Sequence, residues 1–265
     1  MQDFRDDTGP NSTLVYPSDR AVTIAALSDL HVREGTQSEW AEAICSIPPD
    51  VDMLIIAGDL TENGWLGEAE ASAELLSMIN VPKIAVMGNH DLRGLRRRAF
   101  RSVFERAGVE MLEGEHVVVP TASGIEVGIA GVAGSGGGFT VLSEDGPVPA
   151  KALRAMAVRM RREAERLDRA LTQLHTPVRV MVSHFAPTET TLGEEPESKW
   201  WMLGNRDLGR VADRHGVDLV LHGHAHLGSP HGLTEGGIPV RNVALPVNRE
   251  VVVLALPVPA HAANR

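Results

Sequence analysis

The sequence has 265 residues, of which 43% are apolar and 23% are charged, and its formal net charge is −10. This is ordinary globular composition, and the single cysteine excludes an internal disulfide. The negative charge argues against a nucleic-acid partner and against binding to anionic membranes. No segment has the length of a membrane span or the apolar core of a signal peptide, so we expect a cytoplasmic protein without a membrane partner.

The two ends of the chain lack the periodicity of its middle. Residues 1–19 are polar and contain turn formers, and residues 257–265 follow the last apolar run, so they are predicted as a loose leader and a C-terminal tail. Residues 20–256 contain no solenoid repeat and no clear linker, which predicts a single domain. A homo-oligomer is compatible with these features.

Short β-branched apolar runs alternate with segments of helical spacing along this domain. We expect buried strands at 22–27, 51–57, 81–87, 178–182 and 217–221, and helices at 39–47, 68–79, 95–107, 150–174 and 207–215. A hairpin is expected at 116–130, and a second strand pair at 238–244 and 250–256. The alternation predicts an α/β fold, and the two strand pairs predict a mixed sheet.

Each of the five buried runs is followed by residue types that bind metals. These are Asp29 and His31, Asp59, Asn89 with His90 and Asp91, His184, and His222, His224 and His226. A lone Asp or His at such a place is ordinarily a turn or surface residue. If the runs are neighbouring parallel strands, however, all five tips meet at one edge of the sheet. So many carboxylates and imidazoles require cations between them, and the set therefore predicts a metal centre.

The donor types restrict the kind of metal. The lack of a thiolate cluster argues against a structural zinc site and against an iron–sulfur cluster. Mixed His, Asp and Asn donors suit catalytic manganese, iron or zinc, whereas a site for magnesium alone would use fewer imidazoles.

These motifs resemble those of the calcineurin-like metallophosphoesterase family. The matching segments are Asp29-x-His31, Gly58-Asp59-x-x-x-x-Gly64, Gly88-Asn89-His90-Asp91, the isolated His184 and Gly223-His224-x-His226, in the order of the family. The resemblance implies a four-layer βαββαβ sandwich of two mixed sheets flanked by helices. It also implies a metal-dependent hydrolase, with Mn²⁺ as the best candidate and Fe or Zn²⁺ as alternatives.

The resemblance further implies a role for each matching residue. One metal would take Asp29, His31, Asp59 and His226, and the second would take Asp59, Asn89, His184 and His224. A small phosphodiester or phosphomonoester would be hydrolysed by attack of a metal-bridging hydroxide. His90 would face the substrate and assist the leaving group.

Three other residues are candidates for the substrate side of the site. His90 needs a carboxylate to orient it, for which Glu62 is the first candidate and Asp91 the second. Many family members have an Asp where this chain has Glu62, and a solvated loop residue is an equal interpretation. Arg93 is the most plausible phosphate contact, beside Asn89 and His90, among arginines that otherwise form a solvated helix face.

Several weaker signals remain. Residues 134–138 are glycine-rich and are interpreted as a flexible loop near the substrate entrance. Trp200 and its neighbours favour core packing over a pocket wall. The basic segment 151–169 predicts a surface or partner-contact helix, and His222 is expected behind the ligands.

Two other functions compete with a small-molecule phosphoesterase. A nuclease is opposed by the acidic charge and the lack of a basic groove. A non-catalytic binding scaffold on the same fold is opposed by the complete ligand set and the intact His90.

Overall fold

The computed structural model describes residues 21–139 and 150–258. The predicted leader and residues 259–265 of the predicted tail lie outside the described residues, while Pro257 is the last residue of a strand. No helix in the described ranges is long and apolar enough to cross a membrane.

The first sheet has five strands in the order β11-β1-β2-β3-β4. Its strands are β1 Ala21–Leu27, β2 Met53–Ile56, β3 Lys83–Val86, β4 Val109–Leu112 and β11 Val252–Pro257. Strands β1 to β4 are parallel, and β11 pairs antiparallel with β1. The parallel strands therefore share one carboxyl edge.

The second sheet has six strands in the order β5-β6-β7-β8-β10-β9. Its strands are β5 Glu115–Pro120, β6 Glu126–Val132, β7 Val178–Ser183, β8 Leu219–His222, β9 His231–Leu233 and β10 Pro239–Asn242. Strands β6, β7, β8 and β10 are parallel, and β5 and β9 are antiparallel to their neighbours. The hairpin expected at 116–130 is confirmed as β5–β6.

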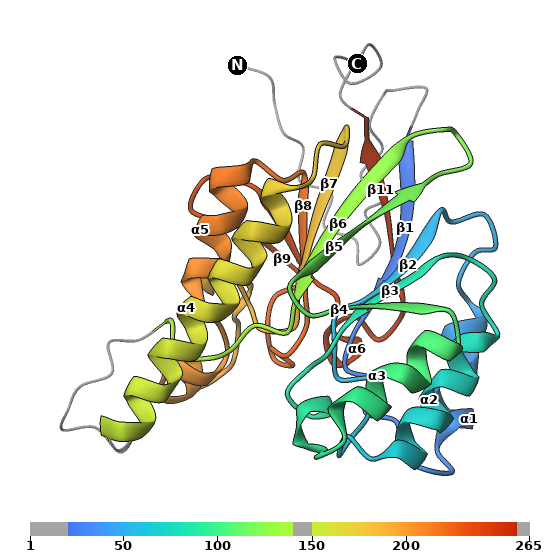
Figure 1. Ribbon diagram of the computed structural model, residues 1–265, viewed down its shortest axis with the longest axis horizontal. Coiled ribbons are helices and arrows are strands. Elements are labelled where there is room, and N and C mark those ends of the chain that lie inside the picture. The colour runs from blue at the N-terminus through green and yellow to red at the C-terminus, as the bar shows by residue number, and fades with distance from the viewer. Residues whose placement is uncertain (1–20, 140–149, 259–265) are drawn as a thin grey trace.

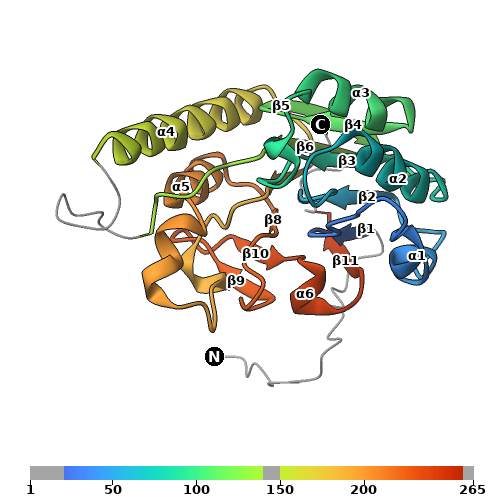
Figure 2. The same cartoon turned by 90° about the horizontal axis from the view of Figure 1, so that it is seen from below.

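Helices cover the outer face of each sheet (Figure 1). The first sheet carries α1 Gln37–Cys45, α2 Leu66–Ser77 and α3 Arg97–Arg106, and the second carries α4 Ala150–Thr172 and α5 Arg206–His215. Short turns complete the chain: η1 Asp91–Arg93, η2 Glu189–Thr191, η3 Glu197–Met202 and α6 Leu245–Asn248. Seen from below, α4 extends well past the edge of the sheets (Figure 2).

Apolar side chains fill the three interfaces of this stack. Alternate residues of β1 divide between them: Ile24 points to the interface between the sheets, and Leu27 to the side of α1–α3. A third layer, with Leu167 of α4, lies under the helices of the second sheet. Strands buried on both faces explain the near-continuous apolar runs, and the predicted four-layer α/β sandwich is confirmed.

One sequence prediction is wrong in detail. The segments 238–244 and 250–256 do not pair, because α6 and the left-handed residue Arg249 redirect the chain, and β10 and β11 join different sheets. The five buried runs divide between the two sheets that the family resemblance implies: β1, β2 and β3 belong to the first, and β7 and β8 to the second. Their tips nevertheless meet, since the two sheets pack face to face.

Candidate metal centre

Backbone hydrogen bonds join the tips of neighbouring strands. The N–H of Asp29 donates to the carbonyl of Gly58 at 3.0 Å, and the N–H of His31 to the carbonyl of Asp59 at 3.0 Å. In the second sheet the N–H of Gly223 donates to the carbonyl of His184 at 3.1 Å. These hydrogen bonds fix the backbone of each loop relative to the neighbouring loop, and so fix the positions from which the ligand side chains extend.

The tips bring together all seven residues predicted as metal ligands. One group joins Asp29, His31 and His226, and a second joins Asp59, His184 and His224; in each group the ligand atoms lie within 4.8 Å of one another. The Oδ1 atom of Asn89 lies 2.9 Å from Nε2 of His184, which places it beside the second group. A third combination, His31 with Asp59 and His90, also satisfies this distance.

The two carboxylates at the centre are buried and ionised. Burial would raise the pKa of Asp29, but His226 and His31 hold that pKa well below its usual range. Burial also opposes ionisation of Asp59, and His184 nevertheless lowers its pKa. For His184 itself, burial favours the neutral form, yet Asp59 and Asp29 raise its pKa to about 9. The site thus attracts positive charge, as a cation site should.

Backbone carbonyls orient two of the imidazoles. Nδ1 of His184 lies 2.9 Å from the carbonyl of Ala57, which leaves Nε2 facing Oδ2 of Asp59 at 3.3 Å. Nε2 of His224 lies 3.2 Å from the carbonyl of Met202, and burial lowers the pKa of this ring to about 3. Metal-binding histidines are commonly oriented by such a bond at their other nitrogen.

His31 provides a further test of whether the residues fit a metal. Both of its ring nitrogens are buried and neither makes a hydrogen bond within the described part of the chain. Its Nε2 atom lies 3.7 Å from Oδ1 of Asp29 and 3.7 Å from Oδ2 of Asp59. Buried polar atoms are rarely left without a partner, and these distances leave room for a cation among the three atoms. The donor set fits divalent metal ions.

Backbone strain is concentrated at the same residues. Among the described residues, five that are not glycine have a positive φ, and four of these are predicted ligands: Asp29 (62°), His31 (46°), Asp59 (49°) and His224 (68°). The left-handed region is unfavourable for side chains other than glycine. Strain that clusters in this way is typical of functional sites.

The third tip approaches the carboxylate of Asp59 very closely. A Cβ atom on Gly88 would lie 2.0 Å from Oδ1 of Asp59, so only glycine fits there. Two residues later, the backbone N–H of His90 donates to the same oxygen at 2.8 Å. The Gly88-Asn89-His90 motif thus positions Asp59 through its backbone.

The ring of His90 is bonded at both nitrogens. Nδ1 lies 2.7 Å from the carbonyl oxygen of Glu62, and Nε2 lies 2.9 Å from Nη2 of Arg93. Because a guanidinium only donates, Nε2 is the acceptor and Nδ1 carries the hydrogen. Burial lowers the pKa of His90, as does the charge of Arg93, so the ring is neutral here.

Glu62 and Asp91, the two predicted partners of His90, differ in their contacts. Oε1 of Glu62 lies 3.5 Å from Nδ1 of His90, and its Oε2 lies 3.3 Å from Nδ1 of His31. The carboxylate of Asp91 instead accepts hydrogen bonds from Thr61 and Gly88 at 2.7–2.9 Å. The ring of His90 is thus oriented by the backbone carbonyl of Glu62 rather than by a carboxylate, while Asp91 links the loop after β2 to the loop after β3.

The loop after β7 supports the last motif through residues that the sequence did not single out. Glu195 is buried, and its two carboxylate oxygens accept from the N–H groups of Gly193 at 2.8 Å and Leu227 at 3.0 Å. No sequence pattern distinguishes Glu195 from other acidic residues of this polar loop. His222 lies behind the ligands as expected, with Nε2 2.8 Å from Oγ1 of Thr191.

Trp200 and the glycine-rich segment pack in the same region. Trp200 is half-buried and packs on a small apolar cluster with Phe139 and Leu203, as the core interpretation expects. Its neighbour Met202, however, is 42% exposed and lies outside the apolar clusters of the described residues. Residues 134–138 lie close to the backbone of the loop: a Cβ on Gly136 would be 2.6 Å from the carbonyl oxygen of Met202. These glycines therefore permit close packing, which the interpretation as a flexible loop had missed.

Comparison with known proteins agrees with this geometry. The family model described as calcineurin-like phosphoesterase matches residues 22–228. No curated protein matches the chain significantly.

Solved structures share the fold at low sequence identity. Phosphopantetheinyl hydrolase from Mycobacterium tuberculosis has 22% identity and a TM-score of 0.61, with 86% of this chain and 90% of that chain covered. A putative 5′-nucleotidase from Staphylococcus aureus has 13% identity and a TM-score of 0.54 (90% and 54% covered). The inner-membrane-complex anchor GAP50 of Plasmodium has 12% identity and a TM-score of 0.51 (85% and 72% covered).

Proposed function

The chain belongs to the calcineurin-like phosphoesterase family, and we propose on that premise that it is a dinuclear-metal hydrolase of a small phosphate ester. One observation carries the proposal: two groups of three potential ligands meet at one rim. Oδ2 of Asp59 lies 3.3 Å from His184 in the second group and 3.7 Å from His31 in the first. A carboxylate in that position suits a ligand shared by two cations.

The residues divide between two cations as follows. Asp29, His31, His226 and Asp59 would hold the first, and Asp59, Asn89, His184 and His224 the second. Manganese suits this mixture of imidazole, carboxylate and amide donors, with iron and zinc as further candidates. When bound, the cations supply the positive charge that activates water and stabilises charge on the phosphoryl oxygens.

The substrate side of the site consists of His90, Arg93 and Glu62. In the described arrangement Nε2 of His90 accepts from Arg93, so an entering substrate oxygen competes with Arg93 for that atom. The Arg93 side chain is 49% exposed and lies 3.9 Å from Oε1 of Glu62, so the phosphoryl oxygens would compete with Glu62 for its charge. His90, once protonated at Nε2, would donate to the leaving oxygen, while the carbonyl of Glu62 keeps Nδ1 in place.

The proposal is tested with p-nitrophenyl phosphate and bis(p-nitrophenyl) phosphate. Metal-free protein receives manganese, iron(II), zinc or magnesium, one at a time, and release of p-nitrophenol is followed. Hydrolysis restored by manganese is expected, and the preferred ester separates monoesterase from diesterase activity. Asp59→Asn is expected to be inactive, whereas Asp50→Asn, which changes an exposed turn, is expected to match the unaltered protein.

The competing functions give different results in the same experiment. Protein that binds metal but leaves both esters intact would support the non-catalytic scaffold. Cleavage of DNA or RNA that weakens steeply with salt would support the nuclease.

A further inference from the structure

A pocket of about 220 Å³ opens beside the candidate metal centre. Its walls include Asn89, Leu92, Ser135, Met156, Arg159 and Phe185. Asn89 is also a predicted ligand of the second metal, so the pocket continues directly from the site. Leu92 belongs to η1, Met156 and Arg159 belong to α4, and Phe185 follows β7.

Three of these residues form apolar walls. Phe185 is 8% exposed, and its ring lies 4.3 Å from the ring of His224 and 5.5 Å from that of His184, centroid to centroid. Leu92 and Met156 are half-buried on the other walls. Small-molecule sites commonly combine such walls with a few polar groups that fix orientation. The walls suit an aromatic ring or a short carbon chain.

Ser135 contributes a polar atom whose bonding is unsatisfied. The residue is 5% exposed, and its buried Oγ atom has no hydrogen-bond partner among the residues described. Such groups are rare in native proteins, and at a pocket they indicate a ligand or an ordered water.

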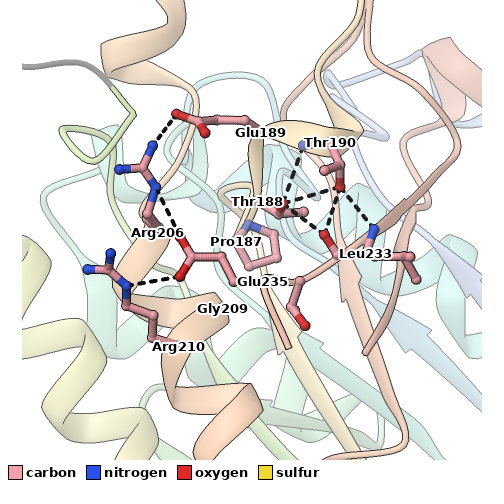
Figure 3. Close-up of a pocket in the computed structure, with 10 residues that line it drawn as sticks. Pro187, Thr188, Glu189, Thr190, Arg206, Gly209, Arg210, Leu233 and Glu235 are labelled. Carbon is pink, nitrogen blue, oxygen red and sulfur yellow. Dashed lines mark hydrogen bonds and ion pairs between the residues drawn. The ribbon is translucent and has the colours of Figure 1, made fainter. Parts of the chain in front are cut away.

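Arg159 contributes a charge that no described residue neutralises. It is exposed on α4 and makes no ion pair within the described ranges, although the chain carries a net charge of −10. A second pocket, of about 130 Å³, provides a contrast (Figure 3). There Arg206 is paired with Glu189, and Arg210 lies 3.4 Å from Glu235. The arginines of that pocket are paired with carboxylates, whereas Arg159 has no carboxylate partner in the part of the chain that the structure describes.

We propose that the pocket beside Asn89 binds the organic part of the phosphate ester, and that Arg159 pairs with a second anionic group on it. The substrate class is thus a small phosphate ester in which an apolar spacer separates the scissile phosphate from a carboxylate or another phosphate. Ser135 supplies a hydrogen bond to a polar atom of the ester. This inference rests on the proposed phosphoesterase function.

The experiment compares three aryl phosphates that share one ring. Phenyl phosphate has no second charge, 4-carboxyphenyl phosphate adds a carboxylate, and 1,4-phenylene bisphosphate adds a phosphate. Release of inorganic phosphate by manganese-loaded protein gives kcat/KM for each. We expect kcat/KM to be about tenfold higher for the two charged esters than for phenyl phosphate, as for one charge-assisted hydrogen bond. For the bisphosphate, a further factor of about two comes from its two equivalent phosphates.

Variants assign this advantage to one arginine. Arg159→Met is expected to remove this advantage and to change kcat/KM for phenyl phosphate far less, because that ester carries no second anion for Arg159 to pair with. Arg154→Met, an exposed change on the same helix outside the pocket, is expected to leave all three values unchanged. The better of the two charged esters identifies the anionic group.

A binding measurement separates failure of this inference from failure of the proposed function. Calorimetry compares phenylphosphonate with 4-carboxyphenylphosphonate, neither of which has an ester bond to cleave. Arg159→Met is expected to weaken only the carboxylate-bearing compound, about tenfold. Equal effects on both compounds, or an equal loss in Arg154→Met, would overturn the inference even in an active enzyme. Absence of turnover with these three monoesters and with bis(p-nitrophenyl) phosphate, with the binding difference intact, would instead overturn the proposed function.

Discussion

The two carboxylate oxygens of Asp59 contact residues from three different loops of the site. Its backbone is held at a φ of 49°, its Oδ1 accepts from the N–H of His90, and its Oδ2 faces the rings of His31 and His184. Every contact of this carboxylate thus comes from a different tip. A change at Asp59 should therefore affect both groups of ligands together.

His90→Ala is expected to keep its metals and to lose most of its turnover. The bond to Asp59 comes from the backbone of His90 and survives the substitution, whereas the ring that would serve the leaving group is removed. Loss of a general acid costs a factor of roughly 10²–10⁴ in rate. Elemental analysis and kcat, measured on the same preparation, check this. If the variant also lost metal, His90 would have to be counted as a ligand, which its proximity to His31 and Asp59 allows.

Metal affinity is expected to rise with pH. In the protein without metal, Asp59 and Asp29 raise the pKa of His184 to about 9 against the effect of burial. A coordinating imidazole must be neutral, so at pH 7 a bound proton has to leave. The apparent affinity for Mn²⁺ should then increase about tenfold per pH unit from 7 toward 9. Calorimetric titrations in buffers of different ionisation enthalpy count the released protons; a constant affinity would contradict the prediction.

At the scale of elements, the glycine-rich segment 134–138 packs closely against the end of η3. Gly136 lies against the backbone of Met202, whose carbonyl bonds Nε2 of His224, and it also lines the pocket beside Asn89. The position of η3 therefore affects the predicted ligand His224 through the carbonyl group of Met202.

Gly136→Ala is expected to destabilise the protein by about 2–3 kcal/mol, because the new methyl group meets backbone atoms that cannot turn aside. Gly124→Ala is the control: it lies in the β5–β6 hairpin with a φ of 78° and open space around it, so only about 1 kcal/mol of backbone strain is expected. Urea unfolding of both variants gives the two free energies. Equal values would show that η3 gives way.

The elements predicted from sequence are those with a strong apolar signal. The runs that became β1, β2, β3, β7 and β8 are buried on both faces, so their composition alone marks them. The strand β4 was not predicted because it has four residues and includes the exposed Glu110, and β9 has only three residues. The sheets that β10 and β11 join depend on where α6 turns the chain, and no local sequence pattern indicates that turn.

The metal ligands were predictable for a related reason, since each follows a buried strand. The contacts of Glu62 and Asp91 were not, because they depend on side-chain directions at two separate tips. Arg159 lies on α4 within a basic stretch, and only the packing of α4 beside Asn89 distinguishes it from its neighbours.

For the whole molecule, the metal centre joins the two sheets. Asp29 and Asp59 follow strands of the first sheet, whereas His184, His224 and His226 follow strands of the second. A cation bound to both sets stabilises the folded state only, since the unfolded chain cannot assemble them.

Removal of the metals is therefore expected to lower the melting temperature. At a free metal concentration about 100 times the Kd, binding contributes about 2.7 kcal/mol, which corresponds to roughly 5–10 °C for a protein of this size. Scanning calorimetry with manganese and with EDTA measures the difference. Asp59→Asn is expected to melt at one temperature in both conditions, and an unaltered protein that did the same would contradict a metal site between the sheets.

The antiparallel pairing of β11 with β1 has a consequence for biosynthesis. The first sheet has an open edge along β1 until residues 252–257 have left the ribosome. His224 and His226 emerge after all other ligands, so the nascent chain holds an incomplete set of ligands until residue 226 has been made. Contacts between such distant segments slow folding. We therefore expect the metal to be acquired only once β11 has emerged and the sheet has closed.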